Sequence, residues 1–152
     1  MVSMRPRFFL STLLLVLAMI LTGCPGLGDR LRVDEEAKVS TEGNKVCFGV
    51  PDADGLYLEY IAINPRGTKF KQQNVYFDPN ISITAGYLCL PPTFYRFPNK
   101  GQFIVEYVLT NKQQANPPRK IVAGLEISNS HIYSIPLTDT ETSKPYSSIN
   151  KP

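Results

Sequence analysis

The fold of this chain is constrained most by a succession of short runs rich in Val, Ile, Tyr and Phe, each bounded by Gly, Pro, Asn or Asp. Runs of this kind are typical of β-strands. No stretch keeps the apolar spacing of a helix for three turns, and the one that comes closest lies in the first 24 residues. The strand-like runs are 44–50, 56–64, 74–77, 81–84, 87–90, 102–110, 120–128 and 131–137. They predict an all-β domain.

The spacing of these runs predicts a single antiparallel β-sandwich of about seven or eight strands, immunoglobulin-like or transthyretin-like in kind. We expect the sandwich to occupy residues 37–138. Residues 24–36 contain Pro25, Gly26 and several charged side chains, which indicates a flexible tether. Residues 139–152 are rich in Ser, Thr, Lys and Pro and predict a disordered tail.

The first 24 residues are typical of a secretory leader. Arg5 and Arg7 give it a positive start, and the uncharged run 8–21 has the length of a signal-peptide core, roughly 7–15 residues, short of the ~20 that span a bilayer. The run ends in Leu-Thr-Gly before Cys24, a pattern that resembles the bacterial lipobox. We therefore expect residues 1–23 to be a cleaved lipoprotein signal peptide. The alternative is an uncleaved signal anchor in which Cys24 has no role.

Lipidation of Cys24 would anchor the mature chain to a membrane. Several acyl chains, each contributing about 0.8 kcal/mol per buried methylene, give stable attachment where one chain is marginal. Residue 25 is Pro, whereas Asp at this place commonly retains enterobacterial lipoproteins in the inner membrane. By that resemblance we expect the outer membrane, with the domain facing the periplasm.

Charge and residue content argue against nucleic-acid binding and catalysis. The chain has 16 basic and 13 acidic residues, and without Arg5 and Arg7 the net charge is only +1, too little for a nucleic-acid binder. His131 is the sole histidine, and no nucleophile motif lies near it. We expect His131 to be a solvated strand-edge residue and Glu106 a solvated outer-face residue. The chain is predicted not to be an enzyme, with no catalytic residues, metal, cofactor or small-molecule substrate.

Cys47 and Cys89 remain as a pair once Cys24 is lipidated, and an oxidising periplasm favours a disulfide between them. Strand alternation places both cysteines opposite the aliphatic side chains of their runs. This predicts a bridge between neighbouring strands of one sheet, on its outer face. Two unpaired buried cysteines are the alternative.

Two loops have the composition of binding surfaces. The loop 91–98 carries three aromatic residues and one arginine, and Tyr and Arg dominate binding hot spots. We predict Tyr95 and Arg96 as contacts to a protein partner. The basic loop 65–71 supplies the second choice, Arg66 and Lys69.

The alternative for the loop 91–98 is a structural one. It would fold back over the end of the sandwich and bury Phe94 and Phe97. Tyr95 and Arg96 are expected to stay exposed in either case.

Several segments together resemble a group of small enterobacterial lipoproteins. They are LTGCPG (21–26), GDR (28–30), VCF (46–48), INPRG (63–67), LCLPP (88–92), GQFIVEY (101–107) and PLT (136–138). The group is described as periplasmic immunity lipoproteins associated with type VI secretion. The resemblance implies a tethered binding protein that neutralises a toxin delivered into the periplasm, and it implies no residue roles. A structural lipoprotein of a secretion or envelope assembly is the alternative.

Overall fold

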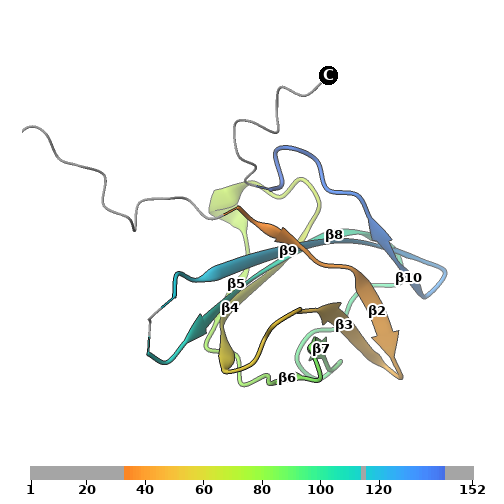
Figure 1. Cartoon of the computed structure of the whole chain (residues 1–152). Helices are drawn as coiled ribbons and strands as arrows, with labels where there is room; N and C mark the ends of the chain where they lie inside the picture. The colour runs from red at the N-terminus through yellow and green to blue at the C-terminus, as the bar shows by residue number, and fades with distance from the viewer. Residues whose placement is uncertain (1–32, 114–115, 143–152) are drawn as a thin grey trace, which may run out of the picture. The chain divides into compact units, whose positions relative to one another are not determined.

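The structure, a computed structural model, describes residues 33–113 and 116–142, which form two β-sheets (Figure 1). The six-stranded sheet has the order β1 (Glu35–Glu36), β9 (Arg119–Ser128), β8 (Gly101–Asn111), β4 (Leu56–Pro65) and β5 (Val75–Phe77), and β10 (His131–Ile135) also pairs with β9. The four-stranded sheet has the order β2 (Val39–Glu42), β3 (Lys45–Gly49), β7 (Tyr87–Leu90) and β6 (Ile83–Thr84). The described residues contain one 3-10 helix, η1 (Phe70–Gln72), and no helix that could cross a membrane.

One hydrophobic core joins the two sheets. Alternate residues of the longer strands, such as Phe103, Val105 and Tyr107 of β8, point into it, as the period of two in a β-strand requires. Its fully buried members from the four-stranded sheet include Phe48, Leu88 and Leu90, and those from the six-stranded sheet include Tyr107 and Leu125. Two sheets around a shared core agree with the predicted β-sandwich.

The prediction of a wholly antiparallel architecture is wrong at one strand. β1 runs parallel to β9, with Glu35 opposite Ile121, so the six-stranded sheet is mixed. A parallel pair needs a long connection, and here the connection is most of the domain. β10 pairs with the same strand in the antiparallel sense, because a tight turn through Asn129 and Ser130, both with positive φ, follows β9 directly.

The predicted domain limits need correction at both ends. β1 lies within the stretch 24–36 that was expected to be a flexible tether, and Ala37 continues its pairing through a hydrogen bond to Val122. At the other end, Glu141 of the expected disordered tail is fixed by an ion pair with Arg66. The predicted signal peptide, Cys24, the tether before residue 33 and the tail beyond residue 142 lie outside the described residues.

Candidate functional site

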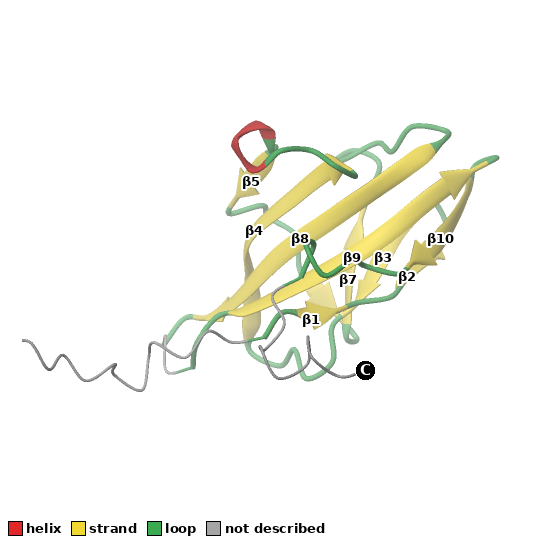
Figure 2. Ribbon diagram, turned by 90° about the horizontal axis from the view of Figure 1, so that it is seen from above, coloured by secondary structure: helices red, strands yellow, loops and turns green. Residues whose placement is uncertain are grey.

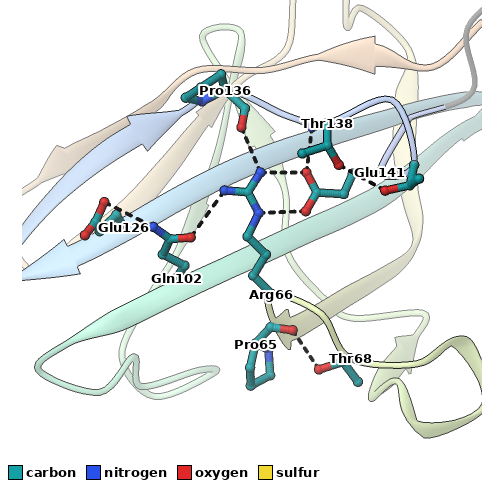
Figure 3. A network of polar contacts seen from close by, with 9 residues as sticks. Pro65, Arg66, Thr68, Gln102, Glu126, Pro136, Thr138 and Glu141 are labelled. Carbon is teal, nitrogen blue, oxygen red and sulfur yellow. Dashed lines mark hydrogen bonds and ion pairs between the residues drawn. The ribbon is translucent and has the colours of Figure 1, made fainter.

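The outer face of the six-stranded sheet is crossed by residues 136–142, which we call the strap. Its anchor is Arg66, at the end of β4 (Figure 3). Arg66 donates two hydrogen bonds to Glu141, from Nε to Oε1 at 2.7 Å and from Nη2 to Oε2 at 2.8 Å. The same guanidinium donates to the Pro136 carbonyl at 3.0 Å and to Gln102 Oε1 at 3.2 Å. The hydrogen bonds that Glu141 accepts from Arg66, and secondarily those from Thr138, lower the pKa of its carboxyl below the ordinary value.

The path of the chain into the strap depends on a glycine of β9. Gly124 pairs with Ile135, the last residue of β10. A Cβ at Gly124 would stand 2.8 Å from the Ile135 carbonyl oxygen and 3.2 Å from Leu137 Cδ2. Only a residue without a side chain lets the chain turn over the sheet at this point.

A polar cavity of about 450 Å³ lies between the strap, the outer face and the η1 loop, by which we mean residues 66–74. Within it, Lys120 Nζ lies 3.4 Å from Asp34 Oδ2 and 3.2 Å from Glu106 Oε2. Tyr60 donates its hydroxyl to Glu106 Oε1 at 3.1 Å, and burial together with this carboxylate raises the pKa of Tyr60 to about 12. Glu106 is therefore a paired, half-buried residue and not the solvated one expected.

The η1 loop is closed by a buried asparagine. Asn64, 4% exposed, accepts a hydrogen bond from the Asn74 backbone N at 2.7 Å and donates to the Asn74 carbonyl at 3.3 Å. The Asn64 side chain thus makes the two hydrogen bonds that a backbone residue of β4 would otherwise make with the segment leading to β5. The loop stands at the edge of the sheet beside β5 (Figure 2).

The loop 91–98 covers the core as the structural alternative predicted. Phe94, Tyr95 and Phe97 are half-buried and pack against the core cluster. The ring of Phe97 lies 4.7 Å from that of Tyr95 and 5.5 Å from that of Phe103, between ring centroids. Arg96 is exposed as expected, but the expectation that Tyr95 is exposed in either case is wrong, because its ring completes this aromatic stack.

Arg66 and Lys69, the second choice of partner contacts, differ in exposure. Arg66 is half-buried, and its guanidinium is occupied by the strap, while Lys69 is exposed directly before η1. Glu141 and Gln102 complete the Arg66 network but carry no sequence signal, since 75 residues separate Arg66 from Glu141. The conspicuous aromatic of the η1 loop is Phe70, which is 87% exposed.

Cys47 and Cys89 form the predicted disulfide, with an S–S distance of 2.08 Å. The two residues lie opposite each other on neighbouring strands β3 and β7, as alternation predicted. Neither belongs to the core cluster that contains Val46, Phe48 and Leu88, so the bridge lies on the outer face of the four-stranded sheet. The Glu42 carboxylate lies beside it, but both sulfurs are bonded and offer no thiolate to a metal ion.

His131 is exposed at the start of β10, in agreement with a strand-edge position. Its Nδ1 lies 2.9 Å from the Asn129 carbonyl oxygen, a contact within its own turn. The ring stacks on Tyr133 at 6.5 Å between centroids. Both contacts lie within the β9–β10 hairpin, so they account for the position of the His131 ring.

A family profile described as a domain of unknown function (DUF7480) matches residues 34–130. The match begins one residue before β1 and ends in the turn between β9 and β10. No curated protein and no solved structure matches the chain.

Proposed function

We propose that this chain, which belongs to the DUF7480 family, is a lipid-anchored periplasmic protein that binds and neutralises a toxin delivered by type VI secretion. The lipobox-like leader and the resemblance to immunity lipoproteins support this proposal. A β-sandwich of the immunoglobulin or transthyretin kind is the architecture we propose for it. Neutralisation by binding requires a standard interface of about 800 Å² per partner, which one loop end of a small two-sheet domain can supply.

The observation that carries the proposal is that Arg96 is exposed on a loop whose neighbouring rings are fixed by packing. It is exposed, and its neighbours Tyr95 and Phe97 are fixed by edge-to-face ring contacts. Phe94 is held in the same way against Tyr76, at 5.3 Å between centroids. A fixed loop loses little conformational entropy when it binds, and a guanidinium recognises a carboxylate through two parallel hydrogen bonds. The proposed partner surface is therefore acidic.

The contact is tested by replacing Arg96 with Ala and measuring capture of the toxin that we expect a neighbouring gene to encode. We expect affinity to fall by about 2 kcal/mol, or roughly 30-fold, with an unchanged melting temperature. Lys45→Ala, an exposed cation on the four-stranded sheet, is the control and should bind normally. Tyr95 is tested only as Tyr95→Phe, because Tyr95→Ala would remove a ring of the aromatic stack. Undiminished capture by Arg96→Ala would refute this contact.

The function itself is tested by deletion. Cells that lose the gene should become sensitive to attack by toxin-producing siblings. Loss of secretion with unchanged sensitivity would instead identify a structural lipoprotein of the assembly.

The anchor is tested by Cys24→Ser. This variant should remain an unprocessed precursor that incorporates no labelled palmitate, because the thioether cannot form. Continued labelling would refute the assignment of Cys24.

A further inference from the structure

The η1 loop exposes an aromatic side chain between two cations. Phe70 is 87% exposed, the largest fraction among the exposed large hydrophobic residues of the described chain. Lys69 and Lys71 flank it and are exposed as well. An exposed aromatic ring next to lysines is typical of segments that lie at the interface of a lipid bilayer.

The exposure of Phe70 is built into the loop. Thr68 donates its hydroxyl to the Pro65 carbonyl at 2.6 Å, and Gln72 N donates to the Lys69 carbonyl at 2.8 Å. The buried side chain of Asn64 holds the far end of the loop at Asn74. These contacts keep the ring of Phe70 away from the core.

The described chain begins beside the cavity that the η1 loop lines. Asp34 and Phe70 line the same cavity on the outer face of the six-stranded sheet. β1 is the strand at one edge of that sheet, and η1 lies beside β5 at the other edge (Figure 2). Val33 follows Cys24 by nine positions, a span of at most about 30 Å. A lipid on Cys24 therefore keeps this face within reach of the bilayer.

The charge of this face also suits an anionic surface. Three of its carboxylates are in ion pairs, Glu141 with Arg66, and Asp34 and Glu106 with Lys120, while Glu126 accepts a hydrogen bond from Gln102. Lys69 and Lys71 form no ion pair with any residue in the described ranges. Their charges remain available to lipid headgroups.

We propose that the η1 loop docks onto the bilayer, with Phe70 entering the headgroup region and Lys69 and Lys71 contacting anionic lipids. This inference rests on the proposed lipid anchor. It gives the tethered domain a defined orientation, with the outer face of the six-stranded sheet toward the membrane.

The test uses the absence of tryptophan from the chain. Phe70→Trp places a single reporter in the lipidated full chain, reconstituted into vesicles of phosphatidylethanolamine and phosphatidylglycerol. We expect emission at shorter wavelength than in detergent-free buffer, and strong quenching by lipids brominated on their acyl chains. Tyr87→Trp is the matched control: Tyr87 is 49% exposed on the four-stranded sheet, so its reporter should not be quenched. Adding Lys69→Gln and Lys71→Gln to Phe70→Trp should reduce the quenching.

Flotation of the same samples distinguishes the docking of the η1 loop from the lipid anchor on Cys24. Protein that floats with the vesicles while Phe70→Trp stays as unquenched as Tyr87→Trp would overturn the docking and leave the anchor intact. Protein that does not float would overturn both, because docking depends on the tether. A shift of the Phe70→Trp emission caused by the toxin and not by lipid would make the loop a protein contact and refute the proposal.

Discussion

Arg66 fastens the strap to the sheet because a planar guanidinium can donate to several acceptors at once. Its fork matches the two oxygens of Glu141, and its remaining donors serve Pro136 and Gln102. A lysine could not make the paired contact. Arg66 was predicted as a partner contact from its place in a basic loop. Its hydrogen bonds within the chain show that it holds the strap on the sheet.

Glu141→Gln should destabilise the domain by about 0.5–1 kcal/mol at pH 7, since the carboxylate and Arg66 are both partly exposed and solvent weakens the pair. Urea unfolding measures this difference. Glu59→Gln, which changes an exposed carboxylate without an ion pair among the described residues, should leave stability unchanged. Equal stability of wild type and Glu141→Gln would show that the strap is held by other contacts.

The same variant has a predicted pH dependence. Hydrogen bonds from Arg66 hold the pKa of Glu141 below its ordinary value, so folding favours the ionised carboxylate. Its contribution is complete above the unfolded pKa of about 4.3 and is lost as the pH falls through the lower folded pKa. The stability difference between wild type and Glu141→Gln should therefore be constant at neutral pH and vanish in acid. A difference that grows on acidification would have the wrong sign.

Among the elements, the turn from β10 into the strap depends on Gly124. Gly124→Ala should cost about 1–3 kcal/mol, because its Cβ would overlap the Ile135 carbonyl oxygen at 2.8 Å. Gly49→Ala is the matched control on β3: a Cβ there meets nothing within 4 Å, so this variant should be neutral or slightly stabilised. Thermal unfolding of both variants compares the costs. Similar melting temperatures would indicate that the strap shifts without penalty.

The strands that alternate apolar and polar residues were predictable from sequence. The run 87–90 coincides with β7, and alternation placed Cys47 and Cys89 opposite the core side chains. β1 and β2 were missed because Glu35–Glu36 and Val39–Glu42 contain almost no apolar side chains, so their pairing is set by tertiary contacts. The same holds for the strap: an ion pair across 75 residues leaves no local pattern.

For the whole molecule, the disulfide is the covalent link with the largest expected effect on stability. It closes a loop with a sequence separation of 42, and its removal should cost about 2–4 kcal/mol through the entropy of the unfolded chain. The double variant Cys47→Ala with Cys89→Ala should therefore unfold at a lower urea concentration, and reductant should lower the midpoint of wild type but not of the variant. A loss of less than about 1 kcal/mol would mean that the unfolded chain keeps these strands close without the bond.

β1 also determines how the domain would respond to mechanical tension. A domain held by a lipid anchor is pulled through the first strand that pairs with its sheet, and among the described residues this strand is β1, which pairs with β9. The Lys120–Asp34 and Arg119–Glu35 ion pairs stand at the same place, so a pull along the strand loads them and the backbone hydrogen bonds together, in shear. Charged residues that look like part of a linker thus form the point at which force from the envelope would enter the fold.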